Sequence, residues 1–281
     1  MEKLTAILVV LGDEASNESL LSKSVALARR SGAQLEVLLP DPTVASGLAT
    51  WFSSIGFAER VSYVLDASGD PLRDVILRRL DEHPADLVMK AAAGTLALRR
   101  VLHAADDLDL AAALPVPLLR TGAKAWKSEM RVAATVDVSE RDGDAVARSI
   151  LHAAGMIAMH CDATLDVLYS EREARDDSVR MERAVRVARL VREFHVGGER
   201  LRLLSGPPDE TLPKAVSTGG YDLVALGTIP RRPATPWSPA LTSLLTNESE
   251  ADVMLVKESR RSAADFGMRA KASVASIPAH P

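Results

Sequence analysis

The chain has 281 residues, of which 47% are hydrophobic and 26% charged, and its formal net charge at pH 7 is −4. This length fits one large domain or two of ordinary size, with enough apolar residues for a packed core. The slight negative charge argues against a general attraction to nucleic acid or an anionic membrane, and an aromatic content of 4% argues against a base-stacking surface.

Targeting and cysteine signals are also weak. No apolar run approaches the ~18 residues that a membrane span needs, and the N-terminal run is too short and too soon acidic for a signal peptide. The single cysteine, Cys161, excludes intrachain disulfides and a cysteine-rich zinc site. The sequence therefore predicts a cytoplasmic α/β protein without nucleic-acid or membrane partners.

The first half of the chain alternates between apolar runs typical of buried strands and amphipathic runs typical of helices. Thr5–Leu11 is an apolar run rich in β-branched residues, and residues 17–31 place apolar side chains at helical spacing. This alternation predicts a parallel sheet wound on both faces. The other expected strands are Gln34–Leu39, Val61–Leu65, Ala85–Met89 and Val116–Leu119, and the other expected helices are a short one within 42–60, Leu72–Glu82 and one at 106–113.

The second half repeats this order after a stretch, residues 121–130, that has no periodic signal and is interpreted as a linker. A Pro-rich loop and a short helix are expected between its last two strands. The expected strands are Arg131–Val136, Ala163–Tyr169, Arg200–Leu204, one from Tyr221 to Gly227 and one ending at Lys257, and the expected helices are 143–160, 174–195 and one ending at Gly219-Gly220.

The repeat is visible in the residues as well as in the pattern. Two similar stretches of more than a hundred residues indicate two copies of one domain, each large enough for its own core. The matching segments are Ser68-Gly69-Asp70-Pro71 with Ser205-Gly206-Pro207-Pro208, Ala85-Asp86-Leu87-Val88 with Tyr221-Asp222-Leu223-Val224, and Val116-Pro117-Leu118-Leu119 with Ala251-Asp252-Val253-Met254.

These segments resemble the universal stress protein family over residues 3–257. The stretches ADLVMK (85–90), ADDLDLAAALPVPLLR (105–120) and ADVMLVK (251–257) are similar to its tandem bacterial form of E type. The resemblance implies two Rossmann-like α/β domains of the adenine-nucleotide-binding type, each with a five-stranded parallel sheet and helices on both faces. Their last strands pair across a pseudo-twofold axis. The expected domains are 1–122, which is degenerate, 130–258, which keeps part of a nucleotide motif, and a flexible tail at 259–281.

ATP-binding members of that family carry an aspartate after the first strand and Gly-x2-Gly-x9-Gly-Ser/Thr after the fourth. In the first half, Leu11 and Ala91 stand at the aspartate and first glycine positions. In the second half Asp137 and Gly227 are kept, but Pro230 replaces the second glycine and no glycine follows at 239–241. Glycine allows backbone N–H groups to approach phosphate, whereas proline has no N–H to offer. The family's phosphate cradle therefore cannot be built unchanged, and the resemblance leaves ATP as an option in the second domain only, with no cofactor expected.

The expected ligand contacts are Asp137, Gly227, Thr228 and Arg231, and all but Gly227 have a structural alternative. Asp137 could cap the turn that follows it, and the hydroxyl of Thr228 could cap a helix. Arg231 could hold phosphate or carboxylate by charge, or belong with Arg232 to a solvated basic turn. The sequence leaves these alternatives open.

Three other residue types need a functional and a structural interpretation. Lys90 interrupts an apolar strand, so it either binds an acidic ligand or pairs with one of Asp106, Asp107 or Asp109, and pairing is favoured. Cys161 is expected to be a small buried thiol rather than a nucleophile. The six histidines include no His-x3-His pair, so no metal site is expected.

We expect a non-enzymatic, cytoplasmic stress-response protein that acts by binding, without catalytic residues or a required cofactor. The two halves would pair within the chain through their last strands. The sequence leaves open a small ligand and a homodimer. One alternative is an adenine-nucleotide-binding or weakly hydrolytic protein that uses the second domain's pocket. The other is a structural assembly module.

Overall fold

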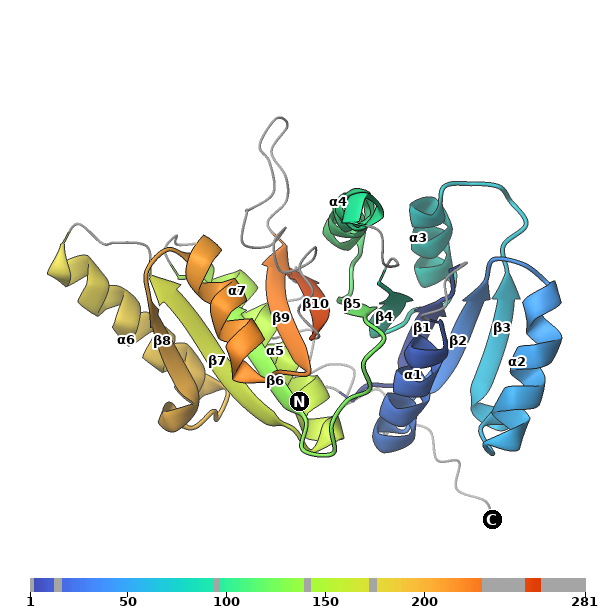
Figure 1. The fold of residues 1–281 in the computed structure, drawn as a ribbon, viewed down its shortest axis with the longest axis horizontal. Helices are drawn as coiled ribbons and strands as arrows, with labels where there is room; N and C mark the ends of the chain where they lie inside the picture. Colours follow the sequence, from blue (N-terminus) through green and yellow to red (C-terminus); the bar gives the residue numbers. More distant parts are fainter. Residues whose placement is uncertain are drawn as a thin grey trace, which may run out of the picture.

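The structure is a computed structural model in which the described residues form one sheet with helices on both faces (Figure 1). For residues 97–104 and 171 only the backbone is described. The described residues are 3–12, 17–92, 97–138, 143–171, 176–228 and 251–258.

The first half follows the predicted order closely. Its last two strands begin two residues later than expected, because the carboxylate of Asp86 binds the start of β1 and Pro117 has no N–H. Its elements are β1 (Ala6–Val10), α1 (Asn17–Ser31), β2 (Gln34–Leu39), α2 (Thr43–Ser54), a 3-10 turn (Ala58–Arg60), β3 (Val61–Leu65), α3 (Leu72–Glu82), β4 (Leu87–Ala91), α4 (Ala97–Ala113) and β5 (Leu118–Thr121).

The second half has the same order up to its fourth strand, and its bounds agree with the predicted ones to within a few residues. The short helix expected before the last strand falls outside the described residues, as does the tail at 259–281. The elements are β6 (Arg131–Val136), α5 (Gly143–Cys161), β7 (Thr164–Glu171), α6 (Asp177–Glu193), a 3-10 turn (Gly198–Arg200), β8 (Leu201–Ser205), α7 (Pro208–Gly219), β9 (Leu223–Thr228) and β10 (Asp252–Lys257).

The two halves share one ten-stranded sheet in the order β3-β2-β1-β4-β5-β10-β9-β6-β7-β8. All neighbours pair in parallel except β5 and β10, which are antiparallel with Met254 opposite Leu119. The expectation of a separate five-stranded sheet in each half is corrected to one sheet with five strands from each. Pairing satisfies the N–H and C=O groups that two open edges would leave bare.

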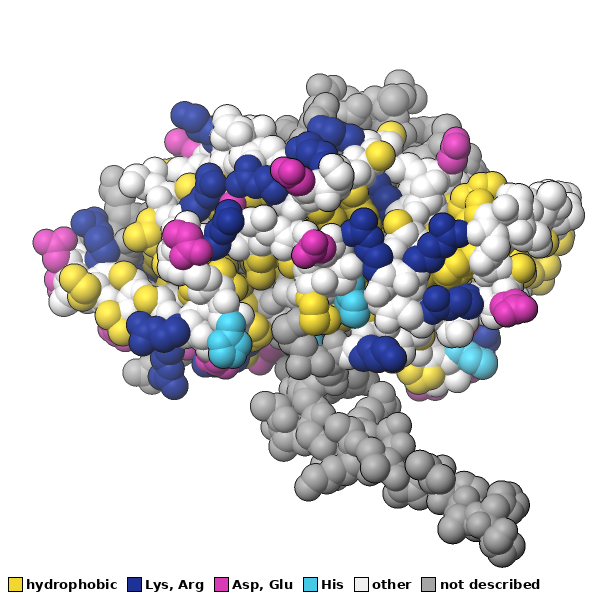
Figure 2. All heavy atoms as spheres, turned by 90° about the horizontal axis from the view of Figure 1, so that it is seen from below, with side chains coloured by type: hydrophobic (Ala, Val, Ile, Leu, Met, Phe, Trp, Pro, Cys, Tyr) yellow, Lys and Arg dark blue, Asp and Glu magenta, His cyan; other side chains and the backbone are white. Residues whose placement is uncertain are grey.

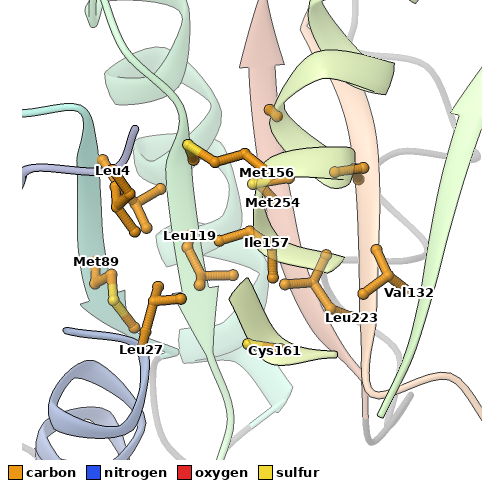
Figure 3. Packing of buried hydrophobic residues seen from close by; sticks show 14 of the residues in the cluster. Leu4, Leu27, Met89, Leu119, Val132, Met156, Ile157, Cys161, Leu223 and Met254 are labelled. Carbon is orange, nitrogen blue, oxygen red and sulfur yellow. The ribbon is translucent and has the colours of Figure 1, made fainter. Parts of the chain in front are cut away.

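Two apolar layers cover the sheet, as the predicted winding requires. Helices α1, α2, α5 and α6 contribute to the core on one face, and α3, α4 and α7 to the core on the other. The first core runs without interruption across the junction of the halves, where Leu119 of β5, Met254 of β10 and Ile157 of α5 lie together (Figure 3). The halves are therefore joined by packing as well as by the strand ladder.

The aspartate of the repeated Asp-Leu-Val segment has the same structural role in both halves. The carboxylate of Asp86 accepts bonds from the backbone N–H groups of Thr5 (2.7 Å) and Ala6 (3.0 Å). The carboxylate of Asp222 accepts bonds from the N–H groups of Lys127 (3.2 Å) and Arg131 (3.0 Å). Each aspartate thus ties the start of its own strand to the start of the half's first strand.

Replacing Asp222 with alanine should lower the free energy of unfolding by about 1–2 kcal/mol, because two backbone donors lose a nearly buried acceptor. Urea denaturation followed by circular dichroism measures the change. The exposed Asp81 of α3 is the control, and its replacement by alanine should change stability by less than about 0.5 kcal/mol. Equal losses for the two variants would contradict the structural role of Asp222.

Candidate functional site

The sheet has two places where an open α/β fold can bind a ligand. Such sites lie beyond the carboxyl ends of neighbouring strands whose connections leave in opposite directions. In this sheet the neighbours are β1 and β4 in the first half, and β6 and β9 in the second. The predicted site residues follow these strand ends.

In the first half the strand ends are filled by apolar side chains and a charge network. Leu11 and Ala91 are buried, with 5% and 6% of their surface exposed. The Nζ of Lys90 lies 2.9 Å from Oδ1 of Asp107, which is buried in α4, and the Nε of Arg120 lies 2.8 Å from its Oδ2. The predicted pairing of Lys90 with a nearby aspartate is confirmed. The sequence analysis missed Arg120, although an arginine in a buried closing strand is itself a signal.

In the second half Asp137 directly follows β6 and is exposed. The start of α5 lies close to it, because a Cβ on Gly143 would collide with the carbonyl of Asp137. Arg186 of α6 donates to Val138 O (2.8 Å) and to the Asp144 carboxylate (2.5 Å). Asp137 therefore lies at the carboxyl end of β6, close to the start of α5.

Gly227 and Thr228 form the end of β9, beside β6. A Cβ on Gly227 would lie 2.7 Å from Val146 Cγ1 and 3.1 Å from Ile150 Cδ1, so this glycine lets α5 pack closely on the strand. Thr228 is fully buried, and its hydroxyl donates to Val256 O at 3.3 Å. Both residues thus have a structural use. Their contact with a ligand stays a prediction.

The rest of the predicted second site lies outside the described residues. These residues are Arg231, Arg232, Pro230 and the segment 239–241. The structure therefore places Asp137, Gly227 and Thr228 at the ends of two adjacent strands.

A buried charge network joins the halves. Both carboxylate oxygens of Asp252 accept bonds from Lys23 Nζ (2.8 and 2.9 Å), and Gly122 N and Trp126 Nε1 complete the set at 2.8 and 2.7 Å. Lys23 and Asp252 are 4% and 1% exposed. Burial raises the pKa of the Asp252 carboxyl, and Lys23 works against that rise. We call Lys23, Gly122, Trp126 and Asp252 the junction cluster.

Sequence analysis missed the junction cluster. The one signal for it in the sequence is the repeat itself: when the two halves are aligned, the charged Asp252 takes the position of Pro117. Lys23 comes from α1, Trp126 from the linker and Asp252 from the start of β10. No local pattern connects three segments so far apart in the chain.

Asp166 of β7 is a second buried carboxylate. Its Oδ2 lies 2.8 Å from Arg131 Nη2, and the hydroxyl of Tyr221 donates to it at 2.9 Å. Arg200 and Arg202 lie 3.6 and 3.4 Å from the carboxylate. This network links the first residues of β6, β7 and β8 to Tyr221, which precedes β9.

Tyr221 should ionise later than an ordinary tyrosine. Burial, and after it the bond to Asp166, raises the pKa of Tyr221 to about 12. The unfolded value is ~10, so the folded state keeps the proton longer and the stability from this group is lost as pH rises from ~10 through 12. In an alkaline titration followed by tyrosinate absorbance, Tyr221→Phe should remove a step near pH 12. A titration curve that is unchanged near pH 12 in that variant would contradict the expectation.

Neither a metal site nor a reactive thiol emerges. Across the described ranges no group of three His, Cys, Asp or Glu side chains could hold a metal ion. Cys161 is buried, as predicted, and burial raises the pKa of its thiol. In the part of the chain that the structure describes, no helix is long and apolar enough to cross a membrane.

No family model and no curated protein matches the sequence. Solved structures do match the fold. A candidate universal stress protein from Pseudomonas aeruginosa has 23% identity and a TM-score of 0.71 over 96% of this chain and 98% of its own. A universal stress protein from Archaeoglobus fulgidus has 13% identity and a TM-score of 0.60 over 91% and 97%. The chain therefore has the fold of universal stress proteins.

The same fold occurs outside stress proteins. The cytoplasmic domain of a prokaryotic cation chloride cotransporter has 13% identity and a TM-score of 0.59 over 94% of this chain and 99% of its own. The fold alone thus does not fix the function, which must come from the residues.

Proposed function

We propose that the chain is a cytoplasmic stress-response protein of the tandem universal stress type, nearest to the E form, that acts by binding rather than by catalysis. In this proposal residues 1–122 and 130–258 are two copies of one domain, and the chain forms an intrachain pseudo-dimer. The fold shared with universal stress proteins over nearly the whole chain supports the stress-response role.

The observation that carries the proposal is the antiparallel pairing of β5 with β10. It gives the sheet an order that reads the same from both edges, β3-β2-β1-β4-β5 and β8-β7-β6-β9-β10. A closed C2 dimer uses the same surface on both subunits, and here the two last strands supply that surface within one chain. The junction cluster then fixes the halves to each other.

Binding without catalysis is favoured by the state of the two strand-end sites. In the first half Leu11 and Ala91 replace the aspartate and the first glycine of the ATP-binding pattern, and the nearby Lys90 is paired with Asp107. In the second half the hydroxyl of Thr228 donates to the backbone carbonyl of Val256, and Gly227 allows α5 to pack closely on β9. No cofactor is expected for the function.

An adenine nucleotide in the second half is the alternative, because Asp137 is exposed at the end of β6. Titration of ATP, ADP and AMP with magnesium distinguishes the proposals. A ligand at 100 times its Kd adds ~2.7 kcal/mol of stability, which a melting curve detects readily. If the chain does not bind nucleotide, its melting temperature should not change at millimolar nucleotide, and no phosphate should be released.

If the melting temperature does shift, Asp137→Ala should reduce the shift and Leu11→Asp should not, and the alternative replaces the first proposal.

Sedimentation tests the pseudo-dimer separately. A chain of 30.1 kDa that contains its own partner should sediment as a monomer. A stable dimer or larger assembly would instead favour a homodimer or a structural module.

A further inference from the structure

We propose that a cavity between the two halves, separate from both strand-end sites, binds a small aromatic anion such as a ring-bearing carboxylate or sulfonate. The cavity has a volume of about 550 Å³. Small-molecule pockets span roughly 300–1,000 Å³. It is walled by one face of α1, by the linker between β5 and β6, and by Cys161 at the end of α5.

The α1 wall leaves room because its side chains there are small. Ser19, Ser22 and Ala26 are three or four residues apart, so they lie on one face of the helix. Ser22 is exposed and Ala26 is half-buried. The hydroxyl of Ser19 donates to Gly122 O at 2.9 Å, which ties this face to the linker at the cavity's edge. The cavity is therefore bounded by anchored segments.

Trp126 supplies a flat apolar wall that is already fixed in place. Its Nε1–H is held by Asp252, and the Lys23 ammonium lies 5.8 Å from the ring centroid. An indole that is held before binding loses little rotamer freedom when a second ring packs against it, which favours a planar ligand. The junction cluster thus positions the recognition surface.

The lining places one cation, Arg30, beside the end of α5, where it can select an anion. Its charged residues are Lys23, Arg30, Lys127 and Glu18. Asp252 neutralises Lys23, and Asp222 lies 3.9 Å from Lys127. This leaves Arg30 as the charge for a ligand. Glu18 is 12 residues away on α1, roughly 18 Å along the helix.

Arg30 can bind an anion without giving up its structural contact. Its Nη1 donates to Cys161 O at 2.7 Å at the end of α5. A guanidinium has about five N–H donors, and charge-assisted bonds to carboxylate or sulfonate are the strong ones. The linker reaches the lower side of Figure 1, and the view from that side shows basic and acidic side chains interspersed over the surface (Figure 2). The charge that selects an anion is therefore the local one of Arg30.

The test uses 8-anilinonaphthalene-1-sulfonate, an aromatic anion whose fluorescence rises in apolar sites. We expect saturable 1:1 binding to the whole chain, with energy transfer from tryptophan. Ser22→Leu should fill the cavity and weaken binding at least tenfold. Ser46→Leu, on an exposed position of α2, is the matched control and should bind as the original chain does.

Charge and ring are tested separately. Arg30→Gln should weaken binding of the probe about tenfold, and Arg30→Lys should weaken it much less. Arg73→Gln, at an exposed position of α3, should leave the affinity unchanged. Naphthoate should displace the probe, and neutral naphthalenemethanol should do so at least tenfold less well. Melting curves and near-ultraviolet circular dichroism show whether each variant is folded.

Absence of binding by the original chain, or equal binding by the folded Ser22→Leu and Ser46→Leu variants, overturns the proposal. Equal competition by naphthoate and naphthalenemethanol overturns its anionic part. None of these results bears on the nucleotide titration or on the monomeric state, so the proposed function is tested independently.

Discussion

Asp252→Asn is expected to lower the free energy of unfolding by about 3–5 kcal/mol, the usual cost of removing one partner of a buried ion pair. Lys23 is 4% exposed and donates to both carboxylate oxygens of Asp252. Asparagine keeps the shape of the side chain but removes its charge, so the Lys23 ammonium is left buried without a counter-charge. Urea denaturation, monitored by circular dichroism, gives the loss.

Two further variants separate the charge from the rest of the junction cluster. Lys23→Met should also destabilise, because the Asp252 carboxylate then keeps only the Gly122 and Trp126 donors. The double variant Lys23→Met with Asp252→Asn should be more stable than the sum of the two losses predicts, since no uncompensated charge is left. Additive losses, or a loss below about 1 kcal/mol for Asp252→Asn, would contradict the ion pair.

Gly227→Leu is expected to destabilise by about 3 kcal/mol, at the upper end of overpacking effects. A Cβ alone would meet Val146 Cγ1 at 2.7 Å and Ile150 Cδ1 at 3.1 Å, so a larger side chain must push α5 away from β9. Gly227→Ala should cost less, and Val146→Ala in the same chain should recover part of that loss. Urea denaturation measures all three variants.

Gly155 provides the control, because a Cβ there meets nothing within 4 Å. It lies inside α5, where alanine is favoured over glycine by roughly 1 kcal/mol, so Gly155→Ala should stabilise the protein. If Gly227→Ala also stabilised, the packing role of Gly227 would be wrong. The glycine would then be free to serve the phosphate motif to which the sequence assigns it.

Local patterns predicted most elements because each strand and helix here has a clear period. α1, β2, β3, α3 and β6 agree with the expected bounds closely. α4 begins earlier than predicted, at Ala97 rather than near residue 106, because its first two turns carry paired arginines that read as a polar connection. The chain's own repeat predicted the equivalence of Asp86 and Asp222.

Contacts between distant segments could not be predicted from the sequence. The partner of Lys90 was narrowed to three aspartates, and only the fold selects Asp107. The junction cluster unites α1, the linker and β10, whose spacing in the chain carries no signal. Gly227 was assigned to a phosphate loop, whereas the structure shows a steric reason for the same glycine. Arg231 lies outside the described residues, so its role stays a prediction.

Hydrogen exchange at β5 and β10 tests the central claim, that these strands join the two halves into one sheet. Leu118, Leu119 and Arg120 pair with Leu255, Met254 and Val253. The amides that face each other across this pair should exchange slowly and with one common opening free energy. Asp252→Asn should accelerate the amide exchange of both strands together. Fast exchange of these amides, as on open sheet edges, or acceleration of β10 without β5, would contradict a continuous sheet.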